Sequence, residues 1–357
     1  MSMGGRKITN KTTKKYPLSF VHVGLPKCMS TTLQHLWMTS HNYNYYPANE
    51  FNDSIEKTIR HHRERAGAVL NSMNINFQPP THSSNVTVFS SEGFSTLWPN
   101  DLAAQPLWGT KQRVIPEFLA AHANKVLLIV RDPVEWIFSS YAQLLKEGRV
   151  IELTDYLNDY RDYIAQVLDI SNFNRLWTES GFEISVLPMD IIKTEPETYW
   201  RTYETQLDLP RPSNYNDKRD CKARNATVTD TLHLQLQLNK LFELLSESVD
   251  GIDNPEDFGD LDNVREILTR GKMWASRRAL DGINSDQVSR LQGLLDPQTP
   301  KISKSMVEIP HELAQHLLLN FVAPLRMLRG WDNLNGLCDR YEDSIATHTS
   351  TQSSKVA

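Results

Sequence analysis

The most informative stretch of the sequence is Phe20 to Trp37, FVHVGLPKCMSTTLQHLW, which predicts a strand, a tight turn and a helix. Its first residues are mostly apolar, as in a short strand that is buried inside a parallel sheet. Gly24 and Pro26 then end the strand, and a run of hydroxyl residues opens a helix. The first turn of a helix has free N–H groups, and the helix dipole favours negative charge beside them. Lys27 adds a positive charge, so the stretch predicts a phosphate-binding loop.

The positions of lysine and glycine distinguish this loop from that of ATP- and GTP-binding enzymes, G-x-x-x-x-G-K-[ST]. Counted from Gly24, the second glycine position holds Met29 and the lysine position holds Ser30, so an ATP enzyme would lack its lysine at the β/γ-phosphates. The pattern P-K-x-x-S-T-x-L instead resembles the 5′-phosphosulfate loop of sulfotransferases, which use 3′-phosphoadenosine 5′-phosphosulfate (PAPS). Met29 replaces the glycine that is usual in that family. The resemblance implies that PAPS is bound by Pro26, Lys27, Cys28, Met29, Ser30, Thr31 and Thr32.

A second motif lies at the end of the apolar run Val126 to Val130, which predicts a central parallel strand. Arg131 and Asp132 follow this run, and Pro133 suits the first turn of a helix. Ser139 lies two helical turns beyond Arg131, and a guanidinium group matches a phosphate bidentately. The motif resembles the 3′-phosphate motif of the same family. The resemblance implies that Arg131 and Ser139 bind the 3′-phosphate, which distinguishes PAPS from ATP.

A third motif is the strand-like stretch 86–93, VTVFSSEG, which places Glu92 at its carboxyl end. Ligands of parallel α/β sheets bind beyond this end of the strands, so Glu92 should face the same crevice as Lys27 and Arg131. It resembles the catalytic glutamate of sulfotransferases that act on carbohydrates and tyrosine, which implies a general base. The cytosolic relatives that sulfate phenols and steroids use a histidine base. The histidines that could serve instead are His41, His62 and His82.

A polar loop over residues 217–227 contains the sequence RNAT at 224–227, which is similar to a late PAPS-binding loop of bacterial family members. The resemblance implies a third PAPS contact from Arg224, with Lys222 as the alternative.

These elements predict an α/β fold with three layers, a P-loop-like central parallel sheet and a C-terminal helical extension. We expect a disordered tail over 1–17, a sulfotransferase core over 18–248, a helical extension or cap over 249–345 and a second tail over 346–357. Hydrophobic periodicity also predicts single helices over 53–70, 114–123 and 150–178, with an aromatic loop over 98–108 that could line the acceptor pocket.

The composition excludes several other classes of protein. The net charge is −5 and the chain contains no long basic patch, which argues against a general nucleic-acid binder. Three widely spaced cysteines form neither a disulfide framework nor a recognisable metal site. No apolar run approaches the roughly eighteen residues of a membrane span. Since the first residues also lack an apolar signal segment, we expect a cytoplasmic protein.

The resemblance implies direct in-line transfer of the sulfuryl group from PAPS to a hydroxyl or amine of a small-molecule or carbohydrate acceptor. The product is 3′-phosphoadenosine 5′-phosphate (PAP), and no metal is required. Lys27 would offset charge on the leaving oxygen, and Glu92 would take the acceptor proton. Two alternatives remain open, a nucleotide kinase of the P-loop type and a PAPS-binding protein without turnover.

Overall fold

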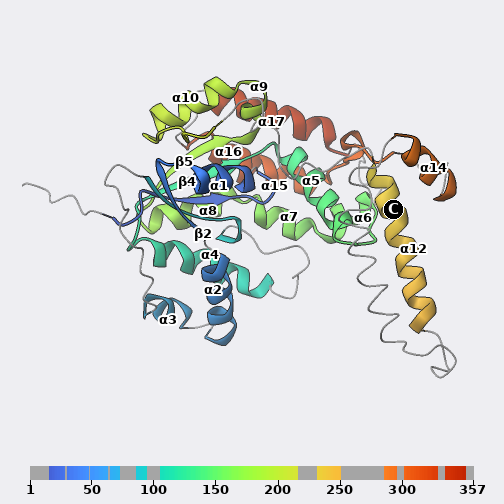
Figure 1. Ribbon diagram of the computed structural model, residues 1–357, viewed down its shortest axis with the longest axis horizontal. Helices are drawn as coiled ribbons and strands as arrows, with labels where there is room; N and C mark the ends of the chain where they lie inside the picture. Colours follow the sequence, from blue (N-terminus) through green and yellow to red (C-terminus); the bar gives the residue numbers. More distant parts are fainter. Residues whose placement is uncertain are drawn as a thin grey trace, which may run out of the picture.

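The structure is a computed structural model, and it describes residues 16–28, 30–47, 49–62, 65–72, 86–94, 105–215, 231–250, 285–295, 301–328 and 334–350. At its centre is a five-stranded, all-parallel sheet with the strand order β2-β3-β1-β4-β5 (Figure 1). The expected α/β class, with a parallel central sheet and a C-terminal helical part, is therefore confirmed. The strands are β1 (Phe20–Gly24), β2 (Tyr43–Pro47), β3 (Val86–Ser91), β4 (Lys125–Val130) and β5 (Glu183–Pro188).

Strand β1 occupies the middle of the sheet, and all of its residues are buried. His22 of β1 pairs with Ser90 of β3 on one side and with Leu127 of β4 on the other. The connection from β3 to β4 must pass over β1, so the strand order reverses there. In parallel sheets such a reversal creates a crevice at the carboxyl ends of the strands. The three predicted motifs, which contain Lys27, Glu92 and Arg131, all lie at the carboxyl ends of these strands.

Helices cover both faces of the sheet. On one face Trp37 packs against Phe20, and on the other Phe89 packs against Phe51, which contacts Phe118. In Figure 1, α9 and α10 lie on one side of the sheet, and α2, α3 and α4 lie on the other. The helices up to β5 are α1 (Ser30–Thr39), α2 (Asn49–His61), α3 (Ala66–Ser72), the single 3-10 turn η1 (Glu92–Phe94), α4 (Gln105–Leu119), α5 (Pro133–Lys146), α6 (Leu153–Asp159), α7 (Arg161–Val167) and α8 (Ile170–Glu179).

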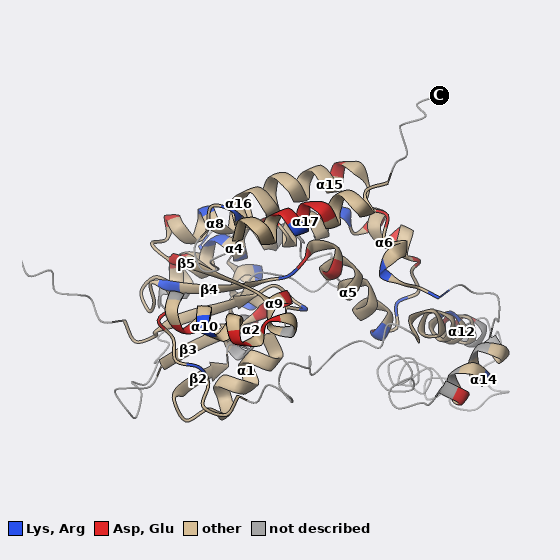
Figure 2. Cartoon of the chain, turned by 90° about the horizontal axis from the view of Figure 1, so that it is seen from above, with Lys and Arg blue, Asp and Glu red and all other residues tan. Residues whose placement is uncertain are grey.

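The C-terminal part of the chain is helical and packs against the core. Helix α17 contacts α5, α15 contacts α7, and α16 contacts α8. Helix α12 is anchored at α5 by Asn239, whose Nδ2 donates to the carbonyls of Leu145 and Arg149 at 2.8 Å each, and it then leads away from the sheet (Figures 1 and 2). The later elements are α9 (Met189–Thr194), α10 (Pro196–Gln206), α12 (Leu232–Asp250), α14 (Ser285–Leu295), η6 (Lys304–Met306), α15 (His311–Leu317), the π-helical turn η7 (Leu318–Val322), α16 (Ala323–Leu325) and α17 (Leu334–His348).

Three helix predictions were wrong in their extent. The helix expected over 53–70 is the pair α2 and α3, and the one expected over 150–178 is the series α6, α7 and α8. The last break occurs because the Asp169 side chain accepts from the N–H of Asn172 and so starts a new helix. Helix α4 begins at Gln105 and not at 114, so Trp108 of the predicted aromatic loop is a buried helical residue. The predicted domain boundary at 248/249 falls inside α12, and α17 runs past 345 to His348.

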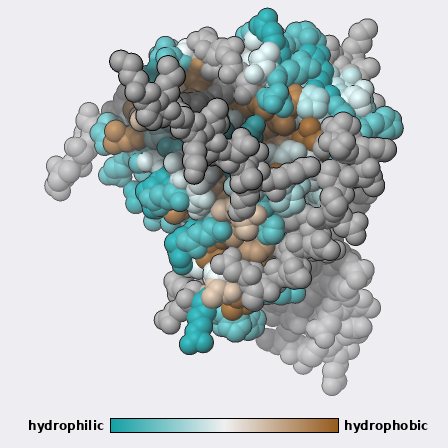
Figure 3. All heavy atoms as spheres, turned by 90° about the vertical axis from the view of Figure 1, so that its left-hand side faces the viewer, coloured by the Kyte–Doolittle hydropathy of each residue, from teal (hydrophilic) through white to brown (hydrophobic). Residues whose placement is uncertain are grey.

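The surface of the described residues mixes charges of both signs. Figure 2 shows acidic and basic residues distributed over the helices, with acidic residues prominent on α17. On the face seen in Figure 3, the described side chains are mainly hydrophilic, with small hydrophobic patches between them. Within the described part of the chain, no helix is both long and apolar enough to cross a membrane.

Candidate functional site

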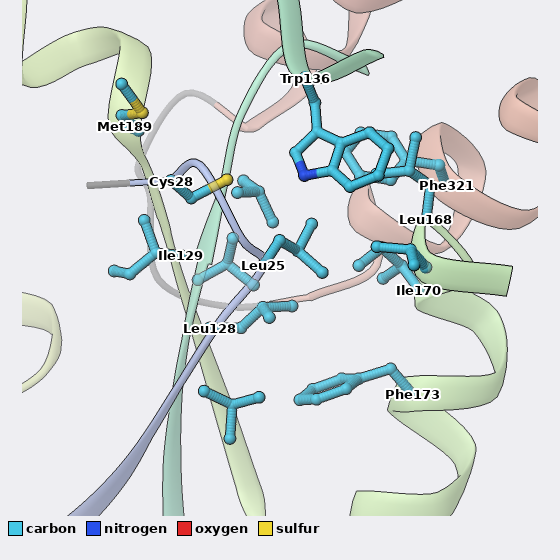
Figure 4. Packing of buried hydrophobic residues seen from close by; sticks show 14 of the residues in the cluster. Leu25, Cys28, Leu128, Ile129, Trp136, Leu168, Ile170, Phe173, Met189 and Phe321 are labelled. Carbon is cyan, nitrogen blue, oxygen red and sulfur yellow. The ribbon is translucent and has the colours of Figure 1, made fainter. Parts of the chain in front are cut away.

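The loop between β1 and α1 is held from behind by apolar packing. Leu25 and Cys28 are 1% and 0% exposed, and Figure 4 shows them among buried side chains that include Ile129 and Trp136. Lys27, between them, has φ of 66°, in the left-handed region that a residue with a Cβ adopts at a cost of roughly 1–2 kcal/mol. The packing on either side therefore maintains an unfavourable backbone conformation at Lys27.

The carbonyl groups of the same loop also face the core. The indole Nε1 of Trp136 donates to the carbonyl of Pro26 at 2.7 Å, and Nη1 of Arg131 donates to the carbonyl of Lys27 at 3.1 Å. In the first turn of α1, the N–H groups of residues 30–32 have no intrahelical acceptor. The loop thus turns its acceptors inward and opens onto the donors of a helix N-terminus, which is the arrangement that an anion requires.

The Lys27 side chain is held by a short chain of polar groups on α5. Its Nζ donates to Oε1 of Gln143 at 2.5 Å, and Nε2 of Gln143 donates to Oε1 of Glu147 at 2.7 Å. Burial lowers the pKa of Lys27, while the negative charges of Glu92 and Glu147 oppose that shift. The ammonium group is therefore partly desolvated and is stabilised by neighbouring carboxylates.

Glu92 lies directly after β3, at the tip of the strand that pairs with β1. Burial raises the pKa of its carboxyl group, whereas the positive charge of Lys27 and the nearby Ser30 hydroxyl lower it. Ser30 is 1% exposed, and a Cβ added to Gly24 would lie 2.0 Å from its Oγ. Only glycine at position 24 leaves the Ser30 hydroxyl in this place. The structure therefore brings together Lys27, Ser30 and Glu92.

Arg131 lies at the tip of β4, on the other side of β1. Its Nη1 donates to the carbonyl of Lys27, and its Nη2 donates to Oε2 of Glu135 at 3.1 Å. Nζ of Lys304, from η6, donates to the other carboxylate oxygen of Glu135 at 2.6 Å. Burial alone would raise the pKa of Glu135, but Lys304 and Arg131 outweigh it and hold that pKa below its usual value. The guanidinium group is thus already paired with a carboxylate.

The remaining predicted residues divide into four groups. Ser139 is half-buried and lies one helical turn from both Glu135 and Gln143. It therefore shares the face of α5 whose side chains hydrogen-bond to Arg131 and Lys27. Thr31 is exposed and Thr32 is buried in the first turn of α1. The alternative bases His41 and His62 are exposed. His41 precedes β2 and so lies at the amino-terminal ends of the strands, whereas Glu92 lies at their carboxyl-terminal ends. The predicted residues that lie outside the described part of the chain are Met29, His82, Lys222 and Arg224.

Sequence reasoning missed a polar network beside Glu92. Nδ1 of His22 lies 2.7 Å from Oγ of Ser90, and Nε2 of Gln34 donates to the same oxygen at 3.0 Å. The hydroxyl of Tyr45 lies near Ser90, which lowers the pKa of the phenol, while burial raises it more. His22 is fully buried, and burial lowers its pKa to about 3, so its ring is neutral. The only signal in the sequence was a histidine inside an otherwise apolar strand.

A second missed network joins α17 to the tips of β4 and β5. Oδ2 of Asp190 accepts from the N–H of Asp132 at 2.9 Å and from the hydroxyl of Tyr341 at 2.7 Å. Oδ1 of Asp132 caps α5 and also accepts from the hydroxyl of Ser344 at 3.1 Å. Two hydroxyl groups of the C-terminal helix therefore fix the turn that carries Arg131.

Comparison with known proteins adds no assignment to this geometry, because no family model matches the chain and no curated protein does. Among the described residues there is also no group of three or more His, Cys, Asp or Glu side chains that could hold a metal ion.

Proposed function

We propose that this protein is a sulfotransferase that moves the sulfuryl group of PAPS to a hydroxyl or amine group of a small-molecule or carbohydrate acceptor. The observation that carries the proposal is the meeting of a lysine and a glutamate at the mouth of an anion-binding loop. Lys27 and Glu92 influence each other's pKa, and the buried Ser30 hydroxyl lies beside the same carboxyl group. Such a site offers a cation for a leaving group and a base for an attacking group.

In this reaction the acceptor oxygen or nitrogen forms a bond to sulfur while the bond from sulfur to the bridging oxygen of PAPS breaks. The acceptor proton goes to Glu92, and PAP leaves with the bridging oxygen. Negative charge grows on that oxygen, and Lys27 together with the first N–H groups of α1 would stabilise it. The raised pKa of Glu92 suits its role, because a base works best when its pKa lies near the working pH.

Arg131 and Ser139 are the proposed ligands of the 3′-phosphate. Glu135 uses part of the same guanidinium group, since its carboxylate is bonded to Arg131 and Lys304. The guanidinium group has five N–H donors, and its Nε has no hydrogen-bond partner among the described residues, so a phosphate could bind at Arg131 while these bonds persist. Lys304 would supply a second cation nearby.

The test is a comparison of thermal unfolding with PAP, AMP and ADP, followed by transfer assays with radiolabelled PAPS and a panel of sugars, lipids and phenols. A ligand that binds only the folded state stabilises it by mass action. We expect PAP to raise the Tm and AMP or ADP to raise it far less. Equal shifts with PAP and AMP would contradict the 3′-phosphate assignment. Magnesium-dependent ATP turnover would instead favour a kinase, and PAP binding without transfer to any acceptor would favour a binding protein.

A further inference from the structure

The network around Ser90 lies on one face of the sheet, next to Glu92. Ser90 pairs with His22 across β3 and β1, and Tyr45 pairs with Val88, two residues before Ser90. Since alternate residues of a strand share a face, Tyr45, Ser90 and His22 all point to the side of α1, which carries Gln34. Tyr45 is half-buried, and after burial the charge of Glu92 is a further cause that raises its pKa. Tyr45 thus lies on the strand next to the one that ends at Glu92, and the charge of Glu92 reaches the phenol.

The proton positions in this network follow from counting donors and acceptors. A serine hydroxyl offers one proton and two lone pairs. Nε2 of Gln34 is a donor and fills one lone pair of Ser90. His22 is neutral, so its Nδ1 either donates to Ser90 or accepts from it.

The second nitrogen of His22 decides between these two cases. Nε2 is buried, and it has no hydrogen-bond partner among the described residues. If Nδ1 accepted, the proton would sit on Nε2 as a buried and unsatisfied N–H, which native proteins strongly avoid. If Nδ1 donates, only a lone pair is left without a partner. The proton therefore belongs on Nδ1, and His22 fills the second lone pair of Ser90.

With both of its lone pairs filled, Ser90 must donate its own proton to the oxygen of Tyr45. The proton of Tyr45 then cannot point at Ser90, and the hydroxyl becomes a donor with a fixed direction. We infer that Tyr45 donates this proton to the acceptor's attacking atom beside Glu92, and that the site therefore selects hydroxyl acceptors over amines. This inference rests on the proposed sulfotransferase function.

The selection follows from the number of lone pairs on the attacking atom. A hydroxyl oxygen has two, so one can accept from Tyr45 while the other attacks sulfur and the acceptor proton passes to Glu92. A neutral amine nitrogen has a single lone pair, which the new bond to sulfur must use. An amine acceptor therefore leaves the Tyr45 donor without a partner in the transition state, and an unsatisfied donor in a desolvated site is costly.

The experiment measures transfer from radiolabelled PAPS to matched pairs of acceptors that differ only in a hydroxyl or an amino group. It uses the full chain, Tyr45→Phe and, as the matched control, Tyr46→Phe, whose side chain lies on the opposite face of β2. We expect the parent protein to prefer the hydroxyl acceptor. Tyr45→Phe should lower hydroxyl transfer about five- to tenfold and leave amine transfer nearly unchanged, so that the preference shrinks. Tyr46→Phe should keep the preference.

Ser90→Ala provides a second variant, because it keeps the phenol and removes its anchor. It should reduce the hydroxyl preference in the same direction as Tyr45→Phe. Equal transfer to amines by the parent protein, or an equal loss for both acceptors in Tyr45→Phe, would overturn the inference while leaving a sulfotransferase. Absence of transfer to every acceptor, together with equal melting shifts for PAP and AMP, would instead overturn the proposed function and this inference with it.

Discussion

Two glutamates on either side of the central strand β1, Glu92 and Glu135, are held in opposite ways. On the β3 side, burial raises the pKa of Glu92 and lowers that of Lys27, so the environment disfavours the charged form of each. On the β4 side, Arg131 and Lys304 together hold the pKa of Glu135 below its usual value. The carboxylate of Glu135 thus has two cationic partners, Arg131 one helical turn away and Lys304 from η6.

This difference separates a reactive region from a supporting one. Groups whose pKa values are shifted by desolvation collect at sites where a ligand or a transition state completes the missing interactions. A carboxylate that already has two cationic partners gains less from a ligand. We therefore assign chemistry to the β3 side and the positioning of Arg131 and the loop to the β4 side. The predictions below test that division.

The largest effect should come from Glu92→Gln, which keeps the shape of the side chain and removes the proton acceptor. Loss of a general base typically lowers the rate by roughly 10²–10⁴-fold. PAP affinity should change little, because the carboxyl group serves the acceptor. Glu135→Gln makes the same chemical change on the β4 side and should retain most of the rate. If both variants lost activity equally, the division between the two sides would fail.

The same carboxyl group predicts a pH dependence. A base acts only when deprotonated, and burial raises the pKa of Glu92 above its ordinary value. The rate should therefore fall as the pH is lowered through this raised pKa, at a higher pH than for an exposed glutamate. The profile of kcat/KM against pH would show it, and Glu92→Gln should lack this acidic limb. An acidic limb that persists in the variant would assign it to another group.

A smaller loss is expected for Lys27→Ala. Removing one group that stabilises charge on a leaving oxygen costs about 10²–10³-fold in kcat. PAP binding should weaken less than kcat falls, because the interaction is strongest in the transition state. Lys146→Ala is a suitable control, since Lys146 also lies close enough to influence the pKa of Lys27. A normal kcat with a raised KM for PAPS would make Lys27 a ground-state ligand.

The positions of the charged groups could largely be predicted from the sequence, and the reasons are local. The apolar runs of β1 and β4 and the residues at their ends predicted where Lys27, Glu92 and Arg131 would lie, since parallel strands share one carboxyl edge. The Ser90 network was not predictable, because it depends on the register of three strands that are distant in the chain. The contacts of Tyr341 and Ser344 depend on how α17 docks, which periodicity alone does not specify.

The smallest effect on activity should follow from loosening α17 at the β4 side. Tyr341→Phe removes the hydroxyl that donates to Asp190, and Ser344→Ala removes the one that donates to Asp132. Each lost hydrogen bond should lower the free energy of unfolding by about 1 kcal/mol, which shifts the Tm of a chain of this size by roughly 1–2 °C. Thr347→Ala is the matched control, because its hydroxyl donates only to a carbonyl of its own helix, that of Asp343. Since Asp132 and Asp190 position the turn that carries Arg131 and do not touch the reacting atoms, kcat should stay nearly constant while PAP binding weakens slightly. A large fall in kcat with an unchanged Tm would mean that α17 acts on the reacting centre itself, and the β4 side could no longer be regarded as support alone.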